Sequence, residues 1–144
     1  MKPNAHNPLY YLYNYFISFS SSDLVYARSL AELLFSMKCL SCWYDRESIE
    51  SSKHFPTEIA KGLEQSRQMI VLVSDNSVAS DWVISEVWSM LSNDPRNRAG
   101  KVIPISLDGT KLPGPLRQLQ TLDASGGFSM ELIDSVVALQ RRDL

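Results

Sequence analysis

The sequence lacks a long apolar run, an excess of basic residues and any abundance of cysteine or histidine. A membrane-spanning helix needs about 20 apolar residues in a row, and no run approaches that length, so we expect no membrane partner. The net charge is −2 at pH 7. Proteins that bind nucleic acid through its phosphates carry a basic excess, so we expect no direct nucleic-acid partner.

The N-terminal stretch MKPNAHNPLYYLYNYFISF is rich in aromatic residues but differs from a signal peptide. It is interrupted by Asn14 and has no small-residue cleavage site after an apolar core. Because the sequence indicates neither export nor membrane insertion, we expect a cytoplasmic protein.

Three glycine-containing motifs of well-known enzymes are also absent. No GxGxxG follows the first predicted strand and no GxxxxGK(S/T) occurs, so the usual backbone cradles for a Rossmann dinucleotide and for P-loop phosphoryl transfer are missing. The GxSxG turn that presents the nucleophile of α/β-hydrolases is missing as well. The sequence therefore indicates none of these three chemistries.

The two cysteines, Cys39 and Cys42, are spaced as CxxC, which raises redox or metal chemistry as alternatives. A redox pair works at the start of a helix, where the dipole lowers a thiol pKa. This pair instead follows a helix-like stretch and lies in a predicted strand, where residues three apart point to opposite faces. A zinc site needs more ligands, and the chain offers only His6 and His54. We therefore predict two small, reduced core residues and no metal site.

The length of 144 residues fits one domain, and we predict a flexible lead-in at 1–10 and a single domain over 11–144. Aromatic and β-branched runs predict strands, whereas apolar residues at helical spacing predict helices. The predicted strands cover residues 11–19, 39–45, 68–74 and 101–107, and the predicted helices cover residues 24–37, 56–66, about 81–92 and 129–140. Residues 75–80 and 108–115 are predicted loops, and residues 116–123 stay ambiguous.

Strands that alternate with helices predict right-handed crossovers and a mainly parallel sheet with helices on both sides. Ligands of such folds bind beyond the carboxyl ends of the strands. The candidate ligand loops are therefore those after strands, at 20–23, 46–54 and 75–80, and Glu86 lies close behind the third. A response regulator has the same architecture and is an alternative interpretation. It needs clustered acids at the end of the first strand, where only Asp23 occurs.

Four stretches occur in a characteristic order: FISFSSSD, CWYDRESIESSKHF, LEQSRQMIVLVSDNSVASDWVISEV and VIPISLDG. In order and spacing they resemble the successive conserved boxes of TIR domains, most closely the bacterial ones, over about residues 13–140. Each stretch alone is common, whereas the four in order are specific. The resemblance implies a flavodoxin-like, three-layer α/β fold with a central, mainly parallel five-stranded sheet flanked by helices.

The resemblance also implies two possible functions. Many TIR domains are assembly modules in immune signalling, and others cleave NAD⁺ at the nicotinamide–ribose bond. In the cleaving members the catalytic residue is a glutamate on the helix after the third strand, and Glu86 matches that position. We predict an NAD⁺ nucleosidase of bacterial immune defence or virulence, with NAD⁺ as substrate and no cofactor. The alternative is a non-catalytic TIR–TIR interaction module in signalling.

Five further residues match positions that the family uses near its ligand: Phe19, Ser20, Asp45, Lys53 and Trp82. The resemblance implies that Phe19 supplies a stacking face, that Lys53 meets a phosphate, and that Trp82 packs against the ribose or the nicotinamide. Other roles stay open: core packing for the two aromatics, helix capping for Ser20, local hydrogen bonding for Asp45, and solvated charges for Lys53 and Glu86.

The second loop, RESIESSKHF at 46–55, is implied to mediate head-to-tail contacts between TIR domains and to complete a neighbour's pocket. Contacts of this kind do not close on themselves and can propagate into filaments. We therefore expect self-association, and activity that rises steeply with protein concentration. The loop departs from the family in having Ser52 where a glycine is usual, and serines follow the first strand where some cleaving members carry arginines.

Overall fold

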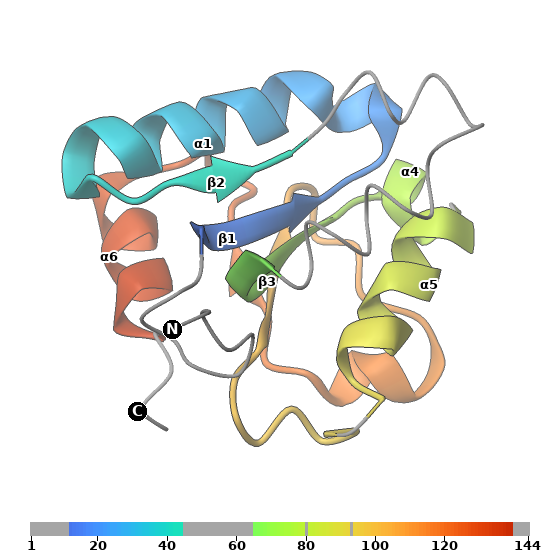
Figure 1. The fold of residues 1–144 in the computed structure, drawn as a ribbon. Coiled ribbons are helices and arrows are strands. Elements are labelled where there is room, and N and C mark those ends of the chain that lie inside the picture. The colour runs from blue at the N-terminus through green and yellow to red at the C-terminus, as the bar shows by residue number, and fades with distance from the viewer. Residues whose placement is uncertain (1–11, 45–64, 80, 93, 140–144) are drawn as a thin grey trace, which may run out of the picture.

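The structure is a computed structural model that describes residues 12–44, 65–79, 81–92 and 94–139, with the backbone alone at positions 81, 82, 85, 86 and 89. Its centre is a sheet of five parallel strands in the order β2-β1-β3-β4-β5 (Figure 1). The strands are β1 (Tyr13–Ser18), β2 (Cys42–Trp43), β3 (Ser66–Val73), β4 (Val102–Ser106) and β5 (Leu122–Asp123). This sheet, with helices on both faces, confirms the predicted flavodoxin-like α/β fold.

The described residues also form four helices and two 3-10 turns, and all of these except the last helix lie between strands in the sequence. They are α1 (Leu24–Lys38), α4 (Asp75–Val78), α5 (Asp81–Met90), α6 (Met130–Ala138), η2 (Ser21–Asp23) and η3 (Gly114–Gln118). None of the helices in the described ranges is long and apolar enough to cross a membrane.

The side chains of β1 alternate between the two faces of the sheet, and this alternation divides the core in two. Tyr15 and Ile17 point to the face that α1 and α6 cover. There they pack with side chains of both helices and of the central strands, among them Leu30, Leu34, Ile70, Ile105, Ile133 and Val136. Figure 1 shows α1 and α6 together on this side.

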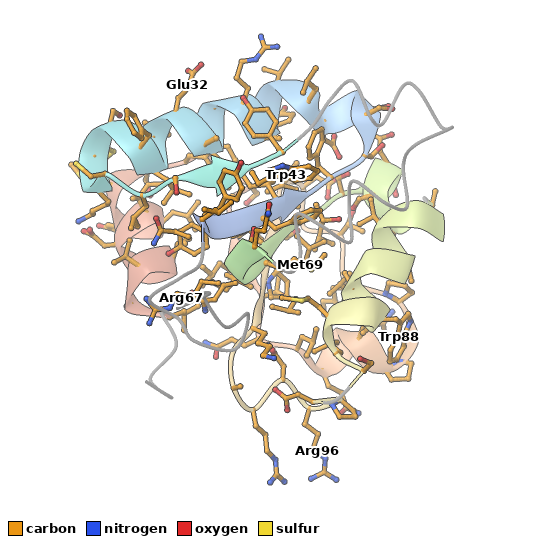
Figure 2. The ribbon with its side chains drawn as sticks, viewed as in Figure 1. Glu32, Trp43, Arg67, Met69, Trp88 and Arg96 are labelled. Carbon is orange, nitrogen blue, oxygen red and sulfur yellow. The ribbon has the colours of Figure 1, made fainter. Side chains whose placement is uncertain are left out.

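The opposite face is covered by α5 and η3. Phe16 points to this side, stacked on Trp43 with the ring centroids 4.9 Å apart. The packed side chains include Met69, Val71 and Val73 of β3, Val83 and Val87 of α5, Leu91 just after that helix, and Leu116 of η3. Met69 lies between the sheet and α5 in Figure 2. Because both faces are covered, every residue of β3 from Gln68 to Val73 is buried, as a nearly continuous apolar strand predicts.

Most predicted elements are present, and two segments differ. Residues 75–80, predicted as a loop, contain α4, because Ser74 caps that helix with a capping box that a serine completes instead of the usual glutamate. The ambiguous stretch 116–123 forms the end of η3 and then the short strand β5. The predicted helix at 56–66 and the lead-in at 1–10 lie almost entirely or entirely outside the described residues.

The prediction that both cysteines are core residues is wrong for Cys39. This residue ends α1 in the left-handed conformation, with φ of +56°, and its side chain is exposed. Cys42 lies in β2 and packs partly buried against the core. Both thiols are free, and burial raises the pKa of Cys42 to about 12, so this thiol stays protonated at neutral pH. Among the described residues no cluster could hold a metal ion.

Candidate functional site

The segments that follow β1, β3 and β4 meet at the carboxyl edge of the sheet. The register pairs Ser18 with Val71 and Val73 with Ser106, so the three strands end close to one another. This is the edge at which folds of this kind bind ligands. In Figure 1 it carries the starts of α1 and α4.

Phe19 directly follows β1 and is only 2% exposed. Its ring belongs to the core under α1 and α6, and it meets the ring of Tyr44 edge-on at 6.2 Å between centroids. The role predicted for Phe19, a free aromatic face for a ligand to stack on, does not fit this burial. The reason is the strand period of two, which places Phe19 on the same side as Tyr15 and Ile17.

Ser20 lies next to Phe19 and is half-buried. It occupies the N-cap position of η2, where its hydroxyl accepts a hydrogen bond from the Ser22 amide at 3.4 Å and its carbonyl accepts one from the Asp23 amide at 2.7 Å. Ser20 is thus a capping residue that remains partly open to solvent. Its contact with a ligand stays a prediction.

The start of α4 is held by a network of side chains, most of them buried, that joins the segments after β1 and β3. The Ser74 hydroxyl accepts a hydrogen bond from the Ser77 amide at 3.1 Å and donates one to the Asp23 carboxylate at 2.5 Å. The Ser77 hydroxyl accepts in return from the Ser74 amide at 2.7 Å. The second oxygen of Asp23 accepts from the Asn76 side-chain amide at 3.3 Å. Asp23, Ser74 and Ser77 are each at most 3% exposed.

A second carboxylate reaches the same turn from the segment after β4. The amide of Asp75 donates to Asp108 at 3.1 Å, and the other oxygen of Asp108 accepts from the Thr110 amide at 3.0 Å. Hydrogen bonding by the Thr110 side chain, with smaller contributions from these amides, holds the pKa of Asp108 below its usual value. A negative charge at the start of a helix is also favourable. The first turn of α4 is therefore anchored from both neighbouring strands.

Trp82 and Glu86 are the second and the sixth residue of α5, which follows α4 closely. Val83 and Val87, the next residue after each of them, are buried against the sheet. Since one helical residue turns the chain by about 100°, positions 82 and 86 share a flank beside this buried stripe. The side chains of Trp82 and Glu86 lie outside the described part of the structure, and so do Asp45 and Lys53.

Of the predicted site residues, Phe19 and Ser20 thus lie at the carboxyl edge of the sheet. The backbone of α5, which carries positions 82 and 86, lies close behind that edge. Sequence reasoning missed the role of Asp23, although it was the single carboxylate noted at the end of the first strand. The sequence did contain a signal for this bond: a single acid follows one predicted strand, and a serine suited to capping a helix follows the neighbouring strand. The two loops of adjacent parallel strands meet in space, so such residues are candidates to bond.

A hollow of about 300 Å³ lies at the opposite, amino edge of the sheet. Its walls include Arg96, Asn97, Gln118 and Gln120 from the segments that flank β4 and η3. Figure 2 shows the Arg96 side chain extending away from the body of the protein. Because this hollow is at the other end of the strands, it is no part of the candidate site.

The fold agrees with the sequence comparison, in which the family model described as TIR domain matches residues 16–137. The chain belongs to the TIR domain family. No curated protein sequence gives a significant match. The matched range begins within β1 and ends within α6, so it includes part of β1 and all of β2, β3, β4 and β5.

Solved TIR-containing structures share the fold. The TIR domain of the Toll-related receptor TRR-2 from Hydra magnipapillata has a TM-score of 0.62 at 18% identity, over 77% of this chain and 83% of that one. A metazoan TIR-STING receptor from C. gigas, in complex with 2′,3′-cGAMP, has a TM-score of 0.75 at 20% identity and covers 100% of this chain. The same receptor in another structure gives 0.71 at 20% identity over 96% of this chain. This chain spans 42% of the length of that receptor.

Proposed function

We propose that this TIR domain is an NAD⁺ nucleosidase of bacterial immune defence or virulence, with Glu86 as its catalytic carboxylate. The observation that carries the proposal is the position of residue 86, near the middle of α5, which is the second helix after β3. This matches the position of the catalytic glutamate in NAD⁺-cleaving TIR domains. The anchored start of α4 would hold that helix at the ligand-binding edge of the sheet.

One carboxylate is enough for this reaction. Glycosidases commonly use two, because an acid must protonate the leaving oxygen. In NAD⁺ the nicotinamide ring is cationic, and it departs as a neutral molecule. The bond from the ribose carbon to the ring nitrogen breaks, and the electron pair stays on that nitrogen. The Glu86 carboxylate would stabilise the positive charge that develops on the ribose. Water then adds to the carbon and loses a proton, giving ADP-ribose, or an internal nucleophile closes a cyclic isomer.

The first test is nicotinamide release from NAD⁺ by concentrated protein. Glu86→Gln keeps the size of the side chain but removes its charge, so the rate should fall about 100-fold to 1,000-fold, as when one electrostatic stabiliser of a transition state is lost. The matched control is Glu32→Gln, because Glu32 is an exposed acid on α1 whose side chain points into solvent (Figure 2). Equal rates for wild type and Glu86→Gln would remove Glu86 from the mechanism.

The same assay tests activation by self-association. The proposal includes head-to-tail contacts through the loop at 46–55, so the rate per molecule should rise with protein concentration. A total rate strictly proportional to concentration would exclude this activation.

The alternative is a TIR domain that only assembles with other TIR domains. It is favoured by the similar structures, which belong to receptors, and by exposed apolar side chains such as Phe35 and Trp88 on the outer sides of α1 and α5. Intact NAD⁺ after long incubation with protein that sediments as an assembly would decide for this alternative.

A further inference from the structure

Asp23 is a buried carboxylate, and apolar packing does not account for its burial. It is 3% exposed, and both of its oxygens accept hydrogen bonds, from Ser74 at 2.5 Å and from Asn76 at 3.3 Å. Within the described residues the ion pair present joins Lys38 and Asp134, so no cation there balances Asp23. Burying a carboxylate without a cation is unfavourable unless hydrogen bonds compensate for the lost water. Here both compensating donors belong to one segment, the start of α4.

The partners of Asp23 connect it to α5. Ser74 is the N-cap of α4, and its amide and hydroxyl complete the reciprocal bonds with Ser77 that start the helix. Ala79 ends α4, and α5 begins at Asp81. Farther along, Val83 and Val87 fix how α5 is turned about its axis, because they are buried against the sheet. Ser74 therefore fixes where the chain enters α4 and α5. Asp23, from the segment after β1, holds Ser74 in place.

We propose that Asp23 is a positioning residue that holds the α4–α5 segment so that Glu86 meets the ribose of NAD⁺. This inference rests on the proposed function for the role of Glu86. Asp23 acts through Ser74 and Asn76 and not on the substrate, because its two oxygens are engaged and its side chain is almost fully buried. A shift of the helix start would move the catalytic group relative to a bound substrate while leaving the rest of the pocket in place.

The test compares variants of the whole chain under assembly conditions. Asp23→Ala should lower kcat roughly tenfold to 100-fold, as expected when a catalytic group is displaced by about 1 Å, with KM changed less than about threefold. Asp23→Asn should recover most of kcat, because its amide oxygen still accepts from Ser74. The matched control is Asp134→Asn, which removes an exposed carboxylate paired with Lys38 and should leave kcat and KM at the wild-type values.

Hydrogen exchange supplies a readout that does not depend on turnover. In Asp23→Ala the amides of residues 75–90 should exchange faster than in wild type, whereas those of β4 should keep their wild-type rates. If Asp23→Ala fails to fold, Asn76→Ala removes one of the two hydrogen bonds and carries the same comparison with a smaller effect.

Each outcome decides one proposal. An unchanged kcat per folded molecule in Asp23→Ala, or unchanged exchange at 75–90, overturns the positioning role. If wild-type protein releases no nicotinamide, the proposed function fails, and exchange then still decides whether Asp23 anchors α4–α5.

Discussion

The two edges of the sheet are fastened in different ways. At the carboxyl edge the bonds depend on carboxylates: Asp23 accepts from the side chains of Ser74 and Asn76, and Asp108 accepts from the Asp75 amide. At the amino edge a side-chain amide bonds to main-chain carbonyls: Gln68 donates to Gly100 at 2.7 Å and to Leu139 at 2.8 Å.

The two edges therefore have different requirements for the residues that form them. Every residue supplies a carbonyl, so the link that Gln68 makes at the amino edge tolerates change in its partners. The carboxyl edge requires particular side chains on two loops at once. We therefore expect loss of Gln68 to change stability alone, and substitutions at the carboxyl edge to change the start of α4 and the rate of the proposed reaction.

The largest stability effect should come from Gln68→Ala. The change leaves two main-chain carbonyls without their donor, and the free energy of unfolding should fall by about 1–3 kcal/mol. Urea unfolding measures this, with Gln118→Ala as the exposed control expected within about 0.5 kcal/mol of wild type. The rate of NAD⁺ cleavage per folded molecule should stay unchanged. A loss of kcat in Gln68→Ala would break the separation between the edges.

An intermediate effect is expected at Asn97, which has φ of +55°. Its side chain accepts from the Val102 amide at 3.0 Å and donates to the Val102 carbonyl at 2.8 Å, closing the turn before β4. Asn97→Gly loses these bonds but fits the left-handed backbone, whereas Asn97→Ala loses the bonds and is strained. Alanine should therefore be less stable than glycine by about 1 kcal/mol in thermal unfolding. Equal stabilities would show that the turn relaxes out of this conformation.

The smallest effects concern pH, and they compare one aspartate from each edge. Amide hydrogen bonds, from Ala99 first and then Arg98, lower the pKa of Asp94, and hydrogen bonding from Thr110 and Asp75 lowers that of Asp108. A carboxyl group whose pKa is lower folded than unfolded stabilises the protein above its unfolded pKa of about 3.9, and this stabilisation is lost as pH falls through the folded pKa.

Asp94→Asn and Asp108→Asn should each flatten the fall of stability below about pH 4 by well under 1 kcal/mol, because solvent screens these groups. Urea titrations at several pH values measure the slope. Asp108→Asn should also speed exchange at the Asp75 amide, which Asp94→Asn leaves alone. Faster exchange at Asp75 in Asp94→Asn would contradict the assignment of Asp108 to the α4 anchor.

The sequence was sufficient for the fold because its periodicities agree with its tertiary structure. The helical spacing of Ala27, Leu30 and Leu34 marks the buried side of α1, and the apolar run in β3 marks a strand covered on both faces. The helix α4 was missed because four residues are too few to show a period. Its capping serines, Ser74 and Ser77, form a pattern that loops share.

The candidate site was less predictable, because it depends on which loops meet. The strand period already placed Phe19 with the core, so its burial could have been foreseen. The bond from Ser74 to Asp23 spans 51 positions in sequence, and no local pattern specifies such a pair. The role of Glu86 remains a prediction taken from the family resemblance.

In the described part of the chain each outer strand of the sheet pairs over two residues, β2 with β1 and β5 with β4. A long, unpaired edge strand would be a template onto which a foreign strand could add, and edge strands as short as these offer almost no such template. Copies of this domain that join in the way proposed would therefore do so through helices and loops. The filament would be a stack of separate sheets, reversible on dilution, instead of one continuous ribbon like that of an amyloid.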